Sequence, residues 1–153
     1  MAKAKEKEEV VVEEKEIEEA FIKQTQWDMK KGRPYVIKGS EILEKRMESE
    51  TIFKGFTGTA GGFYGPQGRI LRLGLSNPSL VENLTSFRFG NHRISNFEME
   101  TSAIYGMGKI LGHHCLSLSA IVANRISREF SKDGNAAVEN LIKQTLSIIS
   151  SSI

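Results

Sequence analysis

The last third of the sequence alternates between strand and helix patterns, and this order constrains the fold most. Residues 94–99 have a strand pattern, and residues 100–111 follow with helical spacing, ending before Gly112. Residues 116–123 form a small and apolar run of strand length, typical of a strand inside a covered sheet. A final helix is expected to begin at Asp133. The order predicts an α/β fold in which helices flank a mixed β-sheet.

The earlier part of the chain is less regular. Ser40 is placed to cap a short helix that begins at Glu41, and residues 53–59 are expected to form a strand. Five glycines or prolines crowd into residues 61–68, which predicts a loop with unusual backbone angles. Residues 76–90 are interpreted as irregular, with a turn at Asn77 and Pro78.

Length and composition bound the class of protein. The chain has 153 residues, of which 39% are apolar and 26% charged, as in soluble globular domains. We divide it into a Lys- and Glu-rich arm or helix start, residues 1–16, and one domain, residues 17–153. A net charge of +2 gives no reason to expect nucleic acid as a partner. The sequence has no apolar run that resembles a leader or could span a membrane, and its single cysteine, Cys115, cannot form an internal disulfide. We therefore expect a cytoplasmic protein with no membrane partner.

Several apparent motifs do not hold. The glycine-rich stretch 58–62 lacks the Gly-Lys-Ser/Thr ending of a phosphate-binding P-loop. The run 113–115, His-His-Cys, does not have the spacing of a metal site, so no metal is expected. Ser117 and Ser119 have no matching base, so a serine nucleophile is not supported.

Two stretches are harder to explain as scaffold. In residues 63–69, Gln67 and Arg69 lie next to aromatic side chains. An amide can match the imide edge of a flat heterocycle, an arginine adds a donor fork, and an aromatic ring offers a stacking face. The alternative is a surface turn with a solvated arginine.

The second stretch, residues 96–100, ends a strand just before a helix. Functional sites in α/β folds gather at the carboxyl ends of strands. A carboxylate there, from Glu98 or Glu100, can accept hydrogen bonds from vicinal sugar hydroxyls. The alternative is a helix amino terminus that favours acidic residues.

Together with Ala120-Ile121-Val122-Ala123-Asn124-Arg125, these stretches resemble three successive signatures of the uridine phosphorylase branch of the nucleoside phosphorylases. The order and intervals also agree, and the resemblance runs from about residue 17 to the end. It implies the second half of the nucleoside phosphorylase fold. It also implies phosphorolysis of a nucleoside to a free base and ribose 1-phosphate, with no cofactor and inorganic phosphate as co-substrate.

The resemblance also implies roles for single residues. Gln67 and Arg69 are expected to hold the base, Glu100 to bind ribose hydroxyls, and Arg125 to lie near the same ring carbonyl. The implied substrate-binding residues are Phe63, Gln67, Arg69, Glu98, Met99, Glu100 and Arg125. The implied catalytic residues are Arg69, Glu100 and Arg125. The mechanism is orientation together with stabilisation of negative charge on the departing base.

Asn124 and Arg125 stand where purine-specific relatives carry an aspartate that acts on the purine ring, so the resemblance implies a pyrimidine nucleoside. The same pair argues against a nucleoside hydrolase. Family members are longer, and their first half supplies a glycine loop and arginines that bind phosphate. Nothing before Ile17 resembles that half.

Three interpretations therefore stay open. The chain is an enzyme whose phosphate ligands come from a partner, a fragment that binds a nucleoside or base without turnover, or an interaction module that reuses the fold. We expect the isolated chain to be nearly inactive, to expose apolar surface, and to form a homo-oligomer.

Overall fold

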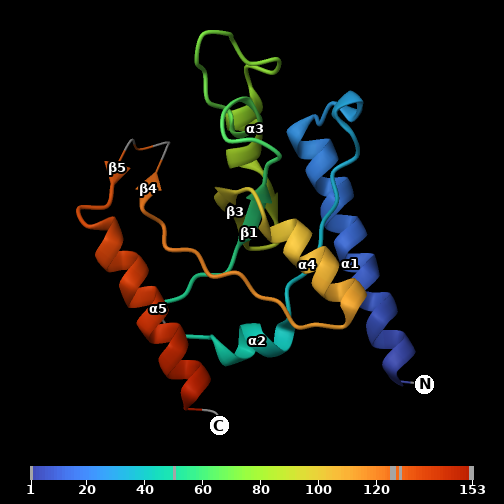
Figure 1. The fold of residues 1–153 in the computed structure, drawn as a ribbon. Helices are drawn as coiled ribbons and strands as arrows, with labels where there is room; N and C mark the ends of the chain where they lie inside the picture. Colours follow the sequence, from blue (N-terminus) through green and yellow to red (C-terminus); the bar gives the residue numbers. More distant parts are fainter. Residues whose placement is uncertain (1, 50, 125–126, 128, 152–153) are drawn as a thin grey trace.

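The computed structural model describes residues 2–49, 51–124, 127 and 129–151, with side chains from Glu13 onward (Figure 1). It is a mixed α/β structure. Its helices are α1 (Ala2–Thr25), α2 (Glu41–Arg46), α3 (Leu80–Ser86), α4 (Thr101–Leu111) and α5 (Gly134–Ser150), with 3-10 turns at Met29–Lys31 and Gly65–Gln67. Its strands are β1 (Phe56–Thr59), β2 (Arg88–Phe89), β3 (His92–Glu98), β4 (Ala123–Asn124) and β5 (Glu129–Phe130). None of the described helices is long and apolar enough to cross a membrane.

The central sheet is small and mixed, as the sequence predicted. Its strand order is β1-β3-β2, with β1 parallel and β2 antiparallel to β3. In the parallel pair, Thr57 lies opposite Asn96 and Thr59 opposite Glu98. The carboxyl ends of β1 and β3 therefore meet at one edge of the sheet.

The buried core lies where α1 and α3 pack beside the sheet. Phe87 is only 1% exposed, and the ring centres of Phe21 and Phe56 lie 5.3 and 5.6 Å from its own. Leu80 and Leu84, one helical turn apart on α3, are buried on the same side. Phe87 thus lies at the centre of an aromatic cluster, and aliphatic side chains complete the buried core around it.

Helix ends follow local signals in the sequence. The Ser40 hydroxyl accepts a hydrogen bond from the Leu43 N–H, and the Asp133 carboxylate accepts one from the Ala136 N–H. Gly112 ends α4 in the left-handed region at φ +74°. These caps confirm the predicted starts of α2 and α5 and the predicted end of α4.

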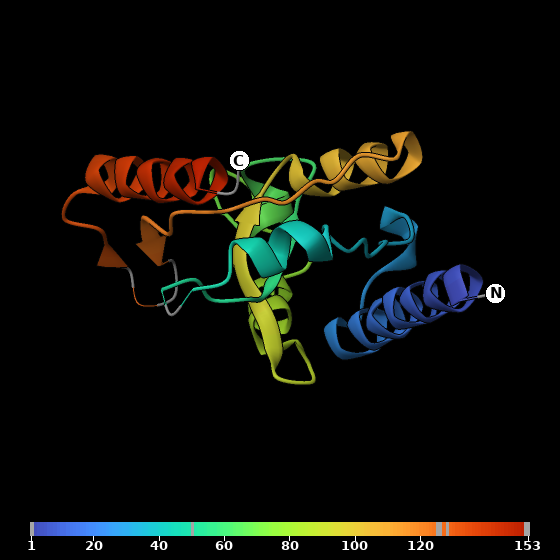
Figure 2. The ribbon, with the colours of Figure 1, turned by 90° about the horizontal axis from the view of Figure 1, so that it is seen from below.

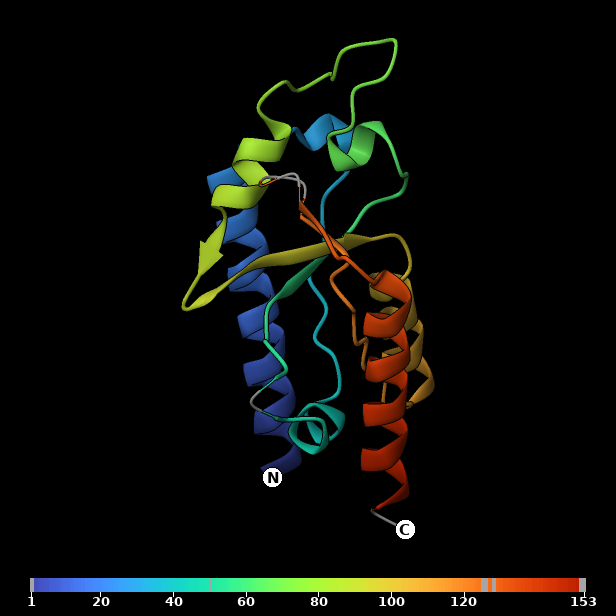
Figure 3. The same ribbon diagram turned by 90° about the vertical axis from the view of Figure 1, so that its left-hand side faces the viewer.

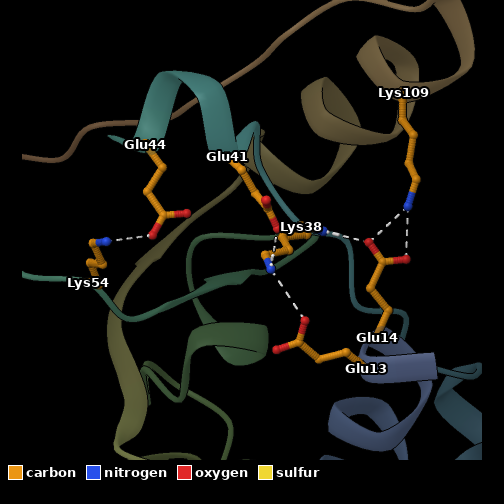
Figure 4. A network of polar contacts seen from close by, with 7 residues as sticks. All are labelled: Glu13, Glu14, Lys38, Glu41, Glu44, Lys54 and Lys109. Carbon is orange, nitrogen blue, oxygen red and sulfur yellow. Dashed lines mark hydrogen bonds and ion pairs between the residues drawn. The ribbon is translucent and has the colours of Figure 1, made fainter. Parts of the chain in front are cut away.

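Ion pairs join α1 to the rest of the chain (Figure 4). The Lys109 Nζ on α4 lies 2.9 Å from both Glu14 carboxylate oxygens, and the Lys38 N–H also donates to Glu14. Lys38 Nζ reaches Glu41 at 2.8 Å and Glu13 at 3.3 Å. The hydrogen bond to Glu41 is the main reason that the pKa of Lys38 is raised. Residues 2–16 of the predicted arm thus form the first part of α1, and Glu13 and Glu14 connect this part to the rest of the chain.

Two predicted elements were wrong. Residues 76–90 are not all irregular, because α3 and β2 form there after the turn at Asn77. The predicted strand 116–123 is absent apart from Ala123 at its end, and the segment runs extended between α4 and β4 (Figure 1). A strand needs a neighbouring strand to pair with, and the described residues do not supply one there.

The molecule is open on one side. Helices α1 and α5 lie on opposite sides of the central sheet, and the extended segment crosses between them (Figures 1 and 3). We expected the apolar faces of α4 and α5 to pack on the sheet. Instead they are largely exposed: the exposed fraction is 55% for Met107 on α4 and 60% for Leu146 on α5. The view from below shows α4 and α5 along the same side of the molecule (Figure 2). The expected exposure of apolar surface is therefore present.

Candidate functional site

The two stretches singled out in the sequence begin at neighbouring strand ends. The loop of residues 60–69 follows β1, and Met99 and Glu100 follow β3. The Ala60 N–H donates to the Glu98 carbonyl at 2.9 Å, which extends the pairing one step beyond Thr59. Parallel pairing thus brings two stretches nearly forty residues apart to one edge of the sheet.

The loop after β1 is held in a defined turn. The N–H groups of Gln67 and Arg69 both donate to the Tyr64 carbonyl at 3.0 Å. Gly68 between them has φ +75°, a region that a side chain disfavours. A Cβ there would also come within 2.1 Å of Val81 Cγ2 on α3. The glycine therefore lets the loop approach α3 and places Gln67 and Arg69 on either side of the turn.

Within this loop, Arg69 stacks on Phe63. The guanidinium carbon lies 3.4 Å from the centre of the Phe63 ring, and Tyr64 meets the same ring edge-on with 5.2 Å between centres. Gln67 is buried, with 5% of its surface exposed. The ring face that was expected to pack against a base is thus in contact with Arg69, and it orients the guanidinium.

The carboxylate of Glu98 is bound within the protein. It accepts hydrogen bonds from the Thr59 hydroxyl and from the N–H groups of Glu100 and Thr101, the last at 2.6 Å. Partial burial raises the pKa of Glu98, but these hydrogen bonds outweigh it and hold the pKa below its ordinary value. Glu98 thus caps the start of α4, which agrees with the alternative of a helix-end acid for this residue.

Glu100 and Met99 face solvent at the same helix start. Both are exposed, and one Glu100 carboxylate oxygen lies 3.2 Å from the Met99 N–H. The Glu98 carboxylate is half-buried and accepts from two backbone N–H groups, whereas the exposed Glu100 carboxylate accepts only from the Met99 N–H among the described residues, so it has capacity left to accept hydrogen bonds from hydroxyl groups.

Sequence reasoning did not single out Thr59. Its hydroxyl donates to Glu98 and accepts from the Ser102 N–H at 3.1 Å, so it connects β1 to the start of α4. One step down the strands, the Thr57 hydroxyl donates to the side-chain amide oxygen (Oδ1) of Asn96 at 2.8 Å. Only the register of β1 against β3 creates these pairs, and a sequence carries no local signal for that register.

A large hollow opens beside this edge of the sheet. Its volume is about 1750 Å³, and it is lined by Thr59, Tyr64, Arg69 and Thr101 among many others, while Gln67 and Glu100 lie outside its lining. Arg125 falls outside the described residues. That Gln67, Arg125 and Glu100 meet at one ligand therefore stays a prediction, although the structure brings their stretches to a common edge.

The chain is similar to known nucleoside phosphorylases over part of their length. A uridine phosphorylase from Thermococcus kodakarensis is 32% identical over 97 residues, which are 62% of this chain and 34% of that protein. The solved structure of a Trypanosoma brucei nucleoside phosphorylase, described as showing uridine phosphorylase activity, has a TM-score of 0.75 and 30% identity. The match covers 90% of this chain and 49% of that one. No family model matches. This chain thus spans a third to a half of these relatives, and its fold is that of the matched part.

Proposed function

Because the chain resembles part of a nucleoside phosphorylase of the uridine phosphorylase type, we propose that it carries the nucleoside-binding part of such an enzyme. The reaction is phosphorolysis of uridine or a related pyrimidine nucleoside to the base and ribose 1-phosphate. The match covers about half of the solved relative, and the proposal assigns phosphate binding to residues outside the matched part. The observation that carries the proposal is the meeting of the Arg69 loop and the Glu100 turn at the carboxyl ends of β1 and β3.

In the proposed site, the loop after β1 binds the base. Gln67 donates to and accepts from the imide edge of the pyrimidine, and Arg69 donates to a ring carbonyl. As the bond to the sugar breaks, negative charge develops on the base, and the Arg69 guanidinium stabilises it. Its stacking on Phe63 supports this role, because it holds the guanidinium in one orientation before a ligand binds.

The turn after β3 binds the sugar. Glu100 accepts hydrogen bonds from the ribose hydroxyls, with Met99 beneath the sugar. Glu98 acts on the site indirectly, since its hydrogen bonds to the Glu100 and Thr101 N–H groups fix the turn that carries Glu100. Arg125 is assigned to the base by resemblance, and together with Asn124 it favours a pyrimidine.

A second candidate function is supported by the open side of the molecule. The exposed fraction is 75% for Leu73 and 79% for Ile110. Such exposed apolar surface is typical of an interaction module. This second candidate would at most bind a nucleoside or base. In that case the apolar surface binds a partner protein, and the polar side chains at the carboxyl ends of β1 and β3 no longer take part in catalysis. The two candidates differ in whether a nucleoside binds.

A titration with uridine distinguishes them. We expect amide and side-chain NMR signals of Gln67, Arg69 and Glu100 to shift as uridine is added, with no shift for adenosine. The absence of any shift at millimolar uridine favours the interaction module. In the same samples we expect almost no phosphate-dependent release of uracil, and rapid release would contradict the assignment of phosphate binding to residues outside these 153.

A further inference from the structure

Helix α4 begins without a cap from the residue that precedes it. The free N–H groups at the start of a helix are commonly bound by the side chain just before the first turn. Glu100 holds that position, yet within the described part of the chain its carboxylate makes no capping hydrogen bond to α4. It accepts instead from the N–H of Met99, at 3.2 Å. The groups that cap α4 therefore come from elsewhere in the fold.

Two side chains at the ends of β1 and β3 supply this cap. The Glu98 carboxylate accepts from the N–H groups of Glu100 and Thr101, at 2.7 and 2.6 Å. The next N–H along the helix, that of Ser102, donates to the Thr59 hydroxyl at 3.1 Å. The Thr59 hydroxyl in turn donates to Glu98. Thr59 and Glu98 thus cap α4 jointly, one from each of two paired strands.

The proton of the Thr59 hydroxyl is already committed. A hydroxyl has a single proton to donate, and that of Thr59 goes to Glu98. One of its acceptor positions is occupied by the Ser102 N–H. Thr59 is also half-buried at the end of β1, where the strand register fixes it opposite Glu98. Any effect of this proton on a bound nucleoside therefore passes through Glu98 and the turn that Glu98 holds.

Without the Thr59 hydroxyl, the Ser102 N–H would need another acceptor. The Glu100 carboxylate is the group best placed to replace it, because a residue just before a helix commonly accepts from the second or third N–H of that helix. The positive end of the helix dipole attracts a carboxylate as well. A Glu100 side chain turned onto the helix no longer offers its oxygens to hydroxyl groups in solution. The Thr59 hydroxyl thus selects between two orientations of Glu100.

We propose that Thr59 is a positioning residue for the sugar contact of the proposed site. Its hydroxyl caps α4 together with Glu98, and the Glu100 carboxylate consequently stays turned outward, where it can accept hydrogen bonds from ribose hydroxyls. The inference rests on the proposed function, since Glu100 is the residue assigned there to the sugar. It adds a residue that never touches the substrate and yet determines whether the sugar is bound.

The base-binding loop does not depend on this hydroxyl. Its turn is held by hydrogen bonds from the N–H groups of Gln67 and Arg69 to the Tyr64 carbonyl, each at 3.0 Å. The Arg69 guanidinium is oriented by the Phe63 ring. Loss of the Thr59 hydroxyl is therefore expected to affect binding of the sugar and to leave the contacts to the base unchanged.

Three variants and two ligands test this role by isothermal titration calorimetry. Thr59→Val keeps the branched shape and removes the hydroxyl, and Thr59→Ser restores it. We expect Thr59→Val to weaken uridine binding about tenfold, the effect of losing one charge-assisted hydrogen bond, and to bind uracil as wild type does. Thr59→Ser is expected to bind both ligands as wild type. The matched control is Thr57→Val, because Thr57 lies two residues earlier on β1 and its hydroxyl donates to Asn96, so wild-type binding is expected.

The pattern across ligands and variants decides the role of Thr59. Equal uridine affinity of Thr59→Val and wild type overturns the proposal. A parallel loss of uridine and uracil affinity does so too, since it would mean damage to the whole site. A loss that Thr59→Ser does not restore, or that Thr57→Val shares, also overturns it. Failure of wild type itself to bind uridine contradicts the proposed function, and the positioning role falls with it.

A measurement without ligand tests the exchange of caps directly. In the wild-type background, Glu100→Ala is expected to leave exchange of the Ser102 amide hydrogen unchanged, because Thr59 binds that group. In the Thr59→Val background, the same substitution is expected to speed this exchange about tenfold, because Glu100 has become the acceptor. Equal effects of Glu100→Ala in both backgrounds overturn the proposal, whether or not uridine binds.

Discussion

Arg69 and Phe63 form a stacked pair, with the guanidinium carbon 3.4 Å from the centre of the ring. Both belong to the loop that Gly68 bends toward α3, and the same loop carries the buried Gln67. The proposed base-binding groups are therefore part of one small folded unit that exists without a ligand. Such preorganisation lowers the entropy lost on binding.

Replacing Arg69 by lysine tests the importance of the planar fork. A lysine keeps the charge but loses the paired donors and the stacking on Phe63. We expect Arg69→Lys to raise the dissociation constant for uracil about tenfold, the effect of losing one charge-assisted hydrogen bond. Isothermal titration calorimetry measures this. Arg72→Lys is the matched control, since Arg72 also lines the hollow but has no assigned role, and an equal loss in both variants would count against the assignment.

The Gly68→Ala substitution tests the turn that carries these residues. The added methyl group meets Val81 and the backbone is held at φ +75°, so we expect a loss of about 1–3 kcal/mol in the free energy of unfolding. Denaturant titration gives the value. At Gly61 a Cβ has open space, and Gly61→Ala is expected to change the stability by less than about 0.5 kcal/mol. Similar effects at both positions would contradict the geometry of the loop.

Glu98 predicts a pH dependence of stability. Its pKa is held below the ordinary value in the folded state, so the folded protein favours the ionised carboxylate. This contribution is complete above the pKa of the unfolded chain and is lost as the pH falls through the folded pKa. We therefore expect wild type to be more stable than Glu98→Gln at neutral pH, with the difference shrinking below about pH 4. Thermal melts across this pH range measure the difference in stability between wild type and Glu98→Gln. The control is Glu19→Gln, since Glu19 is exposed. A difference between wild type and Glu98→Gln that stays constant with pH would show that Glu98 has no such role.

The proposed sugar contact separates Glu100 from the base-binding loop. Because Glu100 is assigned to ribose hydroxyls, Glu100→Gln is expected to weaken uridine binding about tenfold and to leave uracil binding unchanged. Parallel titrations of the two ligands measure the difference. Loss of both affinities would show that Glu100 supports the whole site, and loss of neither would remove it from the proposed contacts.

Much of the secondary structure could be predicted because its signals are local. Ser40, Gly112 and Asp133 mark helix ends through bonds to residues three or four positions away, and the structure confirms all three. The helix α3 was missed because it is short and follows a turn, and its apolar residues Leu80 and Leu84 look no different from those of an irregular stretch.

The sequence alone determined the α/β order of elements, the loop chemistry of residues 63–69, and the likeness to uridine phosphorylases, because these depend on residues close together in the chain. The tertiary structure decided which groups meet. The register that sets Thr59 against Glu98 made one predicted site residue, Glu98, a helix cap, and left Glu100 facing outward. It also left residues 118–121 extended without a partner strand in the described part of the chain, because a strand forms only beside a neighbour that the tertiary structure supplies.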